Sequence, residues 1–492
     1  MRVLFVASEG LPYSKTGGLA DVVEALPKAL VAMGHEVAVL LPRYRGVRPS
    51  ANAVKTLELP MGAATRSCTI VDGARPHGVQ YFLVDDPAYF DRENLYGSAE
   101  ADYPDNAERY AEFAYAAVEV AKQVWTPEAI HCHDWQSGLV PVVLRTRRQG
   151  DAELRATPVI FTIHNMGYQG VFPRQVLGRI GVAESEFRVD GLEFYGKVNY
   201  LKAGLLYSDY LTTVSPQYAE EIQTPEYGHG LDGVVHSRAE RLVGILNGVD
   251  YSVWSPEVDH AIAARYSAKD LSGKTVCKGD LLAEFHLPAN LNRPLAGIIS
   301  RFADQKGFDL LAEIGEELLL EDIAMVVLGS GGEKYVRMFK DLARRYPEKL
   351  GVRIAYDDGL AHKIEAGADM FLMPSRYEPS GLNQIYSLRY GTVPVVRATG
   401  GLVDTVAPFD YDVPRSMGQA TGFSFKEYTG AALLGTMKKA LAAYRDKMTW
   451  RRLQANGMRK DFSWQASATE YGRLYEVARK ARIRSVAASS NV

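Results

Sequence analysis

A lysine and two glycines form a compact segment near the start of the chain. The segment KTGGL (15–19) lies between an apolar run at residues 2–8 and a helical pattern of leucines and valines. Glycines let a backbone approach a phosphate closely, a helix N-terminus favours an anion, and Lys15 adds positive charge. A tight turn with a solvent-exposed lysine explains the same residues, and the spacing is not that of a Walker loop. Alone, the segment is a weak indication of phosphate binding.

Two further cations follow an apolar run in the second half of the chain. The segment SRFADQKGFD (300–309) places Arg301 and Lys306 just after a predicted strand. Open α/β sheets bind ligands at the carboxyl ends of their strands, where two cations can neutralise a leaving pyrophosphate. The alternative is a solvated loop with two ordinary surface charges.

Two more glycine-rich loops repeat the arrangement of strand followed by loop. LGSGG (328–332) and TGGL (399–402) each follow an apolar run, and each can offer backbone N–H groups to phosphate or sugar oxygens. Either loop alone can be a sharp turn, but four such loops at predicted strand ends favour a phosphate-bearing ligand. None has the G-x-G-x-x-G spacing with an acid about twenty residues later, so a nucleotide sugar fits better than a dinucleotide.

A carboxylate stands at the same kind of strand end. In SRYEPSGLNQ (375–384), Glu378 lies between an apolar run and a helix predicted to begin at Ser380. A carboxylate there can stabilise an oxocarbenium-like transition state or bind sugar hydroxyls. Its structural alternative is to cap the helix or to orient Arg376.

Histidines and a second carboxylate follow two strands of the first half. In IHCHDWQSG (130–138), His131 and His133 have a spacing that can bind metal, but no third ligand is evident. Asp134 is either a cleft carboxylate or the N-cap of the next helix. In TIHNMGYQG (162–170), His164 and Asn165 can hydrogen-bond a sugar hydroxyl, or His164 can be a satisfied structural group.

One acidic pair invites a metal-binding interpretation that its context does not favour. Asp410 and Asp412 form a D-x-D motif, but they lie between Pro408 and Pro414 without a preceding apolar strand. We interpret them as a solvated turn and expect no metal site and no cofactor.

Alternating apolar runs and helical patterns predict the elements that position these residues. The pattern predicts two parallel sheets, each covered by helices on both faces. In the first half, strands are expected at 2–8, 37–41, 129–132, 158–163 and 210–214, with helices at 106–123 and 135–147. In the second half, strands are expected at 294–300, 324–329, 352–356, 369–374 and 393–396, with helices from Phe308, Glu333 and Ser380.

A chain of 492 residues with 47% hydrophobic residues is too long for one core and predicts two domains. We expect an N-terminal domain at 1–248 and a C-terminal domain at 249–462, joined through the turn-rich segment 245–259. The amphipathic pattern at 464–484 predicts a last helix, which we expect to complete the N-terminal domain.

Composition excludes several classes of protein. The formal charge of -3 is spread along the chain, which disfavours nucleic-acid binding. The three cysteines form no C-x-x-C pair and fit a reduced compartment, so we expect a cytoplasmic protein. The N-terminal apolar run is too short for a signal peptide, and no run is long enough to span a bilayer. We therefore expect no membrane partner.

Six segments together resemble one family. KTGGLADV, HCHDWQSGL, FTIHNMGYQG, SRFADQKGFD, SRYEPSGLNQ and RATGGLVDTV occur in this order, and the sequence resembles the bacterial glycogen synthase and plant starch synthase family from first strand to last helix. The resemblance implies the GT-B fold, an α/β architecture of two Rossmann-like doubly wound domains facing an interdomain cleft. It implies retaining transfer of glucose from ADP-glucose to the non-reducing end of an α-1,4-glucan, with release of ADP. The N-terminal domain would then face the glucan and the C-terminal domain the donor.

The resemblance also implies roles for individual residues. The catalytic set would be Glu378, His164, Asp134, Arg301 and Lys306. The residues expected to bind ADP-glucose are Lys15, Gly18, Asp21, Asn165, Asn247, Arg301, Lys306, Tyr356, Ser380, Gly381, Leu382, Thr399, Gly400 and Gly401. Within that set, Tyr356 would stack on the adenine, and fixed cations would stabilise the departing ADP because negative charge develops there.

The sequence leaves some choices open. Retention can proceed through a covalent intermediate or through departure and attack on one face, so Glu378 is a stabiliser rather than an assigned nucleophile. Ser380 stands where the family often has cysteine, so we expect activity but no thiol-reagent sensitivity there. The rival functions are a sugar-nucleotide epimerase, a non-catalytic glucan-binding protein and a phosphorylase, the last requiring a pyridoxal phosphate site that the sequence does not reveal.

Overall fold

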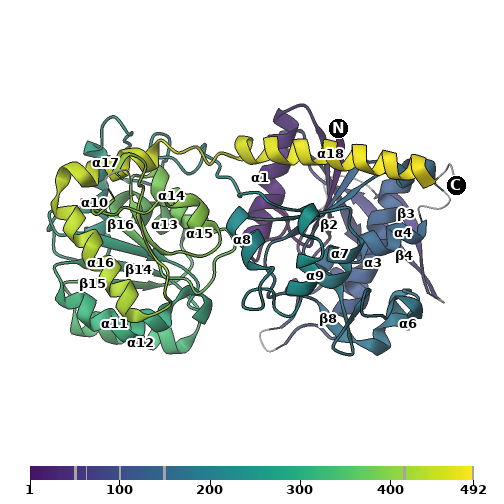
Figure 1. The fold of residues 1–492 in the computed structure, drawn as a ribbon, viewed down its shortest axis with the longest axis horizontal. Coiled ribbons are helices and arrows are strands. Elements are labelled where there is room, and N and C mark those ends of the chain that lie inside the picture. The colour runs from purple at the N-terminus through teal and green to yellow at the C-terminus, as the bar shows by residue number, and fades with distance from the viewer. Residues whose placement is uncertain (49–52, 63, 99–100, 148–150, 414–416, 490–492) are drawn as a thin grey trace. The chain divides into compact units, whose positions relative to one another are not determined.

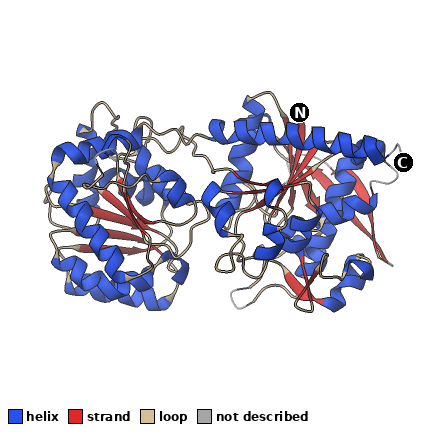
Figure 2. Cartoon of the chain, viewed as in Figure 1, coloured by secondary structure: helices blue, strands red, loops and turns tan. Residues whose placement is uncertain are grey.

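The computed structural model describes residues 1–48, 53–62, 64–98, 101–147, 151–413 and 417–489. The chain forms two compact units. Unit 1 comprises Met1–Gly248 and Trp464–Val492, and unit 2 comprises Val249–Ser463. Each unit contains a sheet with helices packed on it (Figure 2).

Unit 1 is built on a nine-stranded sheet of order β12-β11-β7-β6-β1-β2-β5-β4-β3. Its strands from β12 to β5 run parallel, whereas β4 and β3 continue the sheet as antiparallel neighbours. The strands are β1 (Arg2–Val6), β2 (Glu36–Pro42), β3 (Ala53–Met61), β4 (Ala64–Asp72), β5 (Gln80–Asp85), β6 (Ala129–His133), β7 (Val159–Ile163), β11 (Tyr210–Thr213) and β12 (Leu242–Gly244).

The sequence patterns predicted β1, β2, β6, β7 and β11 and missed β5 and the strands at both edges of the sheet. The antiparallel pair β3 and β4 was not predicted, because its alternation of polar and apolar residues is that of a sheet open to solvent on one face. A separate small antiparallel sheet was also missed. It consists of β8 (Val171–Pro173), β9 (Glu193–Phe194) and β10 (Lys197–Asn199).

The helices of unit 1 cover both faces of its large sheet. They are α1 (Gly18–Ala32), α2 (Pro87–Phe90), α3 (Asn106–Gln123), α4 (Val140–Arg147), α5 (Ala152–Ala156), α6 (Leu177–Ile180), α7 (Tyr200–Tyr207), α8 (Pro216–Glu221), α9 (Asp232–His236) and α18 (Trp464–Ser489). The predicted helix at 135–147 is two elements, because Pro141 stands in the first turn of α4 and a separate 3-10 turn covers Trp135–Ser137.

The last helix belongs to unit 1, as its apolar face requires. Helix α18 runs beside α1 (Figure 1), and Tyr471, Leu474 and Tyr475 are buried in the same cluster as Val3 and Phe5 of β1. The helix continues to Ser489, five residues beyond the predicted end at 484.

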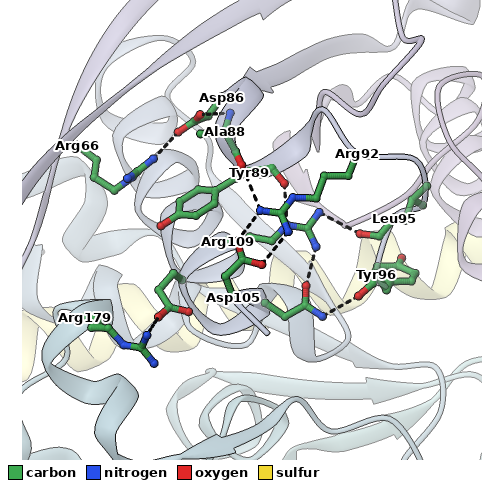
Figure 3. A network of polar contacts seen from close by, with 12 residues as sticks. Arg66, Asp86, Ala88, Tyr89, Arg92, Leu95, Tyr96, Asp105, Arg109 and Arg179 are labelled. Carbon is green, nitrogen blue, oxygen red and sulfur yellow. Dashed lines mark hydrogen bonds and ion pairs between the residues drawn. The ribbon is translucent and has the colours of Figure 1, made fainter. Parts of the chain in front are cut away.

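A buried arginine organises the loop that follows β5. Arg109 of α3 is fully buried, and its guanidinium donates to the carbonyls of Tyr89 and Leu95 at 2.7 and 3.0 Å and to the side chain of Asn106 at 2.6 Å (Figure 3). Asn106 in turn donates to the carbonyl of Tyr96 at 2.8 Å. A buried charge is stable only when its donors are satisfied, so this network fixes the loop at 89–96.

Unit 2 is a six-stranded, fully parallel sheet of order β15-β14-β13-β16-β17-β18. Its strands are β13 (Leu295–Ile299), β14 (Ala324–Gly329), β15 (Leu350–Ile354), β16 (Met370–Met373), β17 (Val393–Arg397) and β18 (Phe423–Phe425). Its helices are α10 (Ser272–Glu284), α11 (Phe308–Leu320), α12 (Glu333–Arg345), α13 (Asp358–Gly367), α14 (Asn383–Arg389), α15 (Gly401–Thr405), α16 (Gly430–Arg445) and α17 (Lys447–Met458).

One predicted helix start in unit 2 is wrong. Helix α14 begins at Asn383 rather than at Ser380, because Gly381 has φ +69° and so interrupts a right-handed helix. Ser380 therefore lies in the loop between β16 and α14. Among the helices that the structure describes, none is long and apolar enough to cross a membrane.

Candidate functional site

A cavity of about 310 Å³ lies at the carboxyl ends of four strands of unit 2. Residues at the ends of β13, β14 and β16, and just after β15, form its walls, as expected for an open parallel sheet. Six residues predicted from the sequence line it: Arg301, Lys306, Tyr356, Glu378, Gly381 and Leu382.

The most enclosed charges of this cavity form an ion pair. Lys306 Nζ lies 2.6 Å from Glu378 Oε2, and Ser375 Oγ donates to the same oxygen at 3.0 Å. The Glu378 side chain is 8% exposed and that of Lys306 is 20% exposed. The cavity therefore presents a cationic and an anionic side chain that hold each other in place.

Glycines bring the two loops of this pair together. Gly307, which follows Lys306, has φ +76°, and a Cβ added there would lie 2.0 Å from the carbonyl oxygen of Pro374. A Cβ on Gly400 would lie 2.1 Å from the carbonyl oxygen of Glu378. Neither contact is possible for another residue, so both glycines serve the close approach of backbones.

The TGGL loop packs against the backbone of Glu378. The N–H of Gly401 donates to the Glu378 carbonyl at 3.1 Å, and the N–H of Leu402 donates to Thr399 at 3.1 Å. Thr399, Gly400 and Gly401 are not among the described residues that line the cavity. Gly401 therefore holds the backbone of Glu378, and the binding of a ligand by this loop stays a prediction.

The structural alternatives for Glu378 are not realised. Arg376 pairs with Asp309, 3.0 Å away, and lies 4.2 Å from the ring centre of Tyr428, so Glu378 does not orient it.

Ser380 is buried at 6% exposure, with its hydroxyl 3.4 Å from the Gly381 carbonyl.

Arg301 and Tyr356 lie on the solvent-exposed side of the cavity. Arg301 is exposed, and Tyr356 is 83% exposed at a position just after β15. Such exposure of a large aromatic ring leaves its face available for stacking. The next residue, Asp357, accepts a hydrogen bond from Leu360 N at 2.9 Å and caps α13.

In unit 1, Asp134 stands directly after β6 in an unusual backbone conformation. Its φ is +55°, and its Oδ1 accepts a hydrogen bond from the backbone N–H of His164 at 2.8 Å. The N–H of Asn165 bonds to the same carboxylate. The alternative role as an N-cap is wrong, because no cap bond from Asp134 forms. Burial raises the pKa of Asp134 to about 7, although the two N–H donors oppose the shift.

The three histidines near Asp134 are neutral. Burial lowers the pKa of His164 to about 3 and places the pKa values of His131 and His133 well below their usual range. The two ring nitrogens of His131 bond the hydroxyls of Tyr475 and Thr162 at 2.8 and 2.6 Å. His131 is therefore a satisfied core histidine.

The KTGGL segment follows β1 as a loop whose last two residues, Gly18 and Leu19, begin α1. Lys15 Nζ lies 2.6 Å from Asp21 Oδ1, so these two predicted residues contact each other, and Gly18 is exposed at the first position of the helix. Asn247 follows β12 and is buried, and within the described part of the chain its Oδ1 has no hydrogen-bond partner.

Sequence reasoning missed Glu9. This residue is buried at 4% exposure after β1, and its carboxylate accepts hydrogen bonds from both the backbone N–H and the hydroxyl of Thr16, the latter at 2.8 Å. Burial raises its pKa. The signal was a carboxylate immediately after an apolar strand, which is the criterion that singled out Asp134.

A second cavity was also missed. It measures about 410 Å³ and belongs to unit 1, where its walls include Trp135, Tyr168 and Asn106. Its lining residues come from four separate segments, around 102–106, 135, 167–172 and 229, so no local pattern reveals it.

Known proteins match both units. Residues 2–237 match the family model of the starch synthase catalytic domain, and residues 283–456 match that of glycosyl transferases group 1. The glycogen synthase of Koribacter versatilis (strain Ellin345) is 53% identical over 484 residues, which cover 98% of this chain and 99% of that protein. The chain belongs to the glycogen and starch synthase family. The glycogen synthase of Anaeromyxobacter sp. (strain Fw109-5), 47% identical over 96% of this chain and 99% of that protein, is a further relative.

Solved structures give the same result for this member of the family. The catalytic domain of starch synthase IV from Arabidopsis thaliana, bound to ADP and acarbose, has a TM-score of 0.87 at 33% identity and covers 97% of this chain and 99% of that chain. Sucrose-phosphate synthase from Thermosynechococcus elongatus, at 19% identity and a TM-score of 0.60 over 98% of this chain and 99% of that chain, shows the shared fold alone. The fold is GT-B, and this family member is a retaining glucosyltransferase.

Proposed function

We propose that this chain transfers glucose from ADP-glucose to the non-reducing end of an α-1,4-glucan, with retention and release of ADP, as a glycogen synthase does. The observation that carries the proposal is the cavity of unit 2, which combines the Lys306–Glu378 ion pair with the exposed ring of Tyr356. The family relationship supports the choice of donor and acceptor, since starch synthase IV is bound to ADP and acarbose.

The charges of the cavity suit a departing diphosphate. Breaking the bond between glucose and ADP develops negative charge on the phosphate oxygen, and preorganised cations lower the barrier when they are aimed at that charge. Arg301 and Lys306 are the cations that would do so. Tyr356 would stack on the adenine, and Glu378 would stabilise positive charge on the sugar.

The polar residues of unit 1 suit sugar hydroxyls and the diphosphate. Lys15 and the start of α1 at Gly18 would bind phosphate oxygens, and Asp21 would hold Lys15 through their ion pair. Asp134, His164 and Asn165 would surround the transferred glucose. The unpartnered Oδ1 of Asn247 would accept a further hydroxyl.

The glucan would bind to the cavity of unit 1. Its walls combine aromatic faces, Trp135 and Tyr168, with an amide, Asn106, and carbohydrate sites need both apolar faces and directed polar groups. The ring of Tyr168 is 59% exposed, so a sugar can cover it.

The test is incorporation of labelled glucose into glycogen from ADP-glucose, beside UDP-glucose, with and without a chelator. We expect incorporation from ADP-glucose that the chelator leaves unchanged, because Arg301 and Lys306 supply the positive charge. Glu378→Gln is the inactive reference, and Glu427→Gln, at an exposed position, is the matched control. No incorporation from either donor would overturn the proposal and favour an epimerase or a glucan-binding protein.

A further inference from the structure

Three imidazole rings form a row that leads from the core of unit 1 to its predicted sugar-binding residues. His131 and His133 lie in β6 and are fully buried, and His164 follows β7. The ring centres of His131 and His133 are 4.2 Å apart, and those of His133 and His164 are 5.3 Å apart. Only His164 is partly exposed, so it is the end of the row that a ligand can reach.

The first two rings of the row are held on several sides. Hydroxyl groups of Tyr475 and Thr162 bond both nitrogens of His131. Phe5 stacks on His133 with ring centres 5.3 Å apart and an angle of 24° between the rings. His133 therefore has little freedom to rotate, and its Nδ1 points in a fixed direction toward the ring of His164.

His133 and His164 share one hydrogen bond. His133 Nδ1 and His164 Nε2 are 3.0 Å apart, so one of these nitrogens carries the proton and the other accepts it. Both rings are neutral, because burial lowers the pKa of each, so each ring carries a single N–H. Two arrangements are possible, and they give His164 opposite tautomers.

The far nitrogen of His133 decides between them. His133 Nε2 is buried and has no hydrogen-bond partner among the residues that the structure describes. If His164 donated, His133 would carry its proton on this nitrogen and would bury an N–H without an acceptor, which folded proteins avoid more strictly than a bare acceptor. The favoured arrangement has His133 Nδ1–H donating to His164 Nε2.

We propose that His133 is a positioning residue that holds His164 as its Nδ1–H tautomer, so that His164 donates a hydrogen bond to an oxygen of the bound sugar. Within the described chain, His164 Nδ1 makes no hydrogen bond of its own, which leaves its proton for a ligand. The inference rests on the proposed function, because it takes the ligand to be a sugar. The inference adds His133, a residue that would not itself contact the ligand, to the residues that determine how the sugar is bound.

The test combines three variants with two measurements. His133→Phe keeps an aromatic ring and removes both nitrogens, His133→Asn keeps an amide N–H near the position of Nδ1, and His131→Asn is the buried control that does not contact His164. Imidazole ¹⁵N spectra of the full chain report the tautomer of His164, whose signal is assigned by its loss in His164→Gln among the ten histidines. Initial rates with ADP-glucose and glycogen give kcat and KM.

We expect the native chain to show His164 protonated on Nδ1. In His133→Phe that signal changes to the other tautomer or to a mixture, and kcat falls about tenfold, which corresponds to one lost hydrogen bond. His133→Asn restores the tautomer and most of kcat. His131→Asn leaves the His164 signal unchanged. If the row served only to stabilise the fold, His131→Asn and His133→Phe would instead have similar effects.

Two results would overturn the inference: a native His164 protonated on Nε2, or a tautomer and a kcat that His133→Phe leaves unchanged. If His133→Phe does not fold, the spectrum of the native chain and of His133→Asn still decides. Failure of the proposed function is distinct, because it appears as no incorporation by the native chain, whereas the spectra report the tautomer without any turnover.

Discussion

In unit 2 the two most enclosed site residues form a charged pair, whereas the predicted site residues around Asp134 in unit 1 are partly buried and their pKa shifts favour the neutral forms. Lys306 Nζ and Glu378 Oε2 lie 2.6 Å apart in the cavity of unit 2. Burial instead raises the pKa of Asp134 to about 7 and lowers that of His164 to about 3. Full charges suit a diphosphate and an oxocarbenium-like centre, while neutral donors and acceptors suit hydroxyl groups. We therefore expect these two groups of residues to serve different chemical parts of a nucleotide sugar.

The largest expected effect comes from neutralising the carboxylate of unit 2. Glu378→Gln keeps the shape of the side chain and removes its charge, so we expect kcat to fall by about 10³-fold. Initial rates of glucose incorporation measure it, with Glu427→Gln as the surface control. A variant with native kcat would remove Glu378 from the chemistry and leave unit 2 as a binding unit only.

A smaller loss is expected from removing the cation of the same pair. Lys306→Ala takes away one stabilising charge from the departing ADP, so kcat should fall by about 10²-fold. The double variant Lys306→Ala with Glu378→Gln should lose less than the product of the single losses, because the two side chains contact each other. Lys439→Ala, at an exposed position, is the control. Native kinetics for Lys306→Ala would exclude it from the site.

For unit 1 the prediction concerns pH. Because the pKa of Asp134 is raised to about 7, its ionised fraction grows between about pH 6 and 8, and kcat/KM should rise with pH over this range if the anion is the active form. His164 stays neutral throughout and adds no step. Asp134→Asn should abolish the rise. A native profile that is flat from pH 6 to 8 would contradict the assignment.

The same shift predicts an effect on stability with a defined sign. A carboxyl group whose folded pKa lies above its unfolded value disfavours the folded state as pH rises, from the unfolded pKa up to about 7. Asp134→Asn should therefore melt at a higher temperature relative to the native chain at pH 8 than it does at pH 4. Melting temperatures of both proteins across this range measure it, and parallel curves would show that the Asp134 pKa is not raised.

The smallest expected effect is on thiol chemistry. The three cysteines are buried, and burial raises the pKa of each thiol, so the native chain should keep its activity in an alkylating reagent. Ser380→Cys should change kcat by no more than about twofold, since hydroxyl and thiol are similar in shape. Only this variant should then be inactivated slowly by the reagent, with ADP protecting it. Rapid inactivation of the native chain would contradict the prediction.

The residues that sequence reasoning located share one property. Arg301, Lys306 and Glu378 each follow a continuous apolar run, and parallel strands end at one edge of a sheet, so the sequence pattern predicts that they lie together. Glu9 was missed although it follows an apolar strand as Asp134 does. The second cavity was missed because it gathers segments that are far apart in the chain.

The sequence by itself determined the alternation of strands and helices, the dependence of α18 on an apolar surface and the order of the six family segments. These are properties of spacing and composition, and spacing along a chain sets which face of an element is buried. Packing of the elements established that Glu378 pairs with Lys306, that Gly401 bonds the Glu378 backbone, and that burial lowers the pKa values of the histidines in the row. Such facts depend on distances between segments and on exclusion of water, which arise when the elements pack.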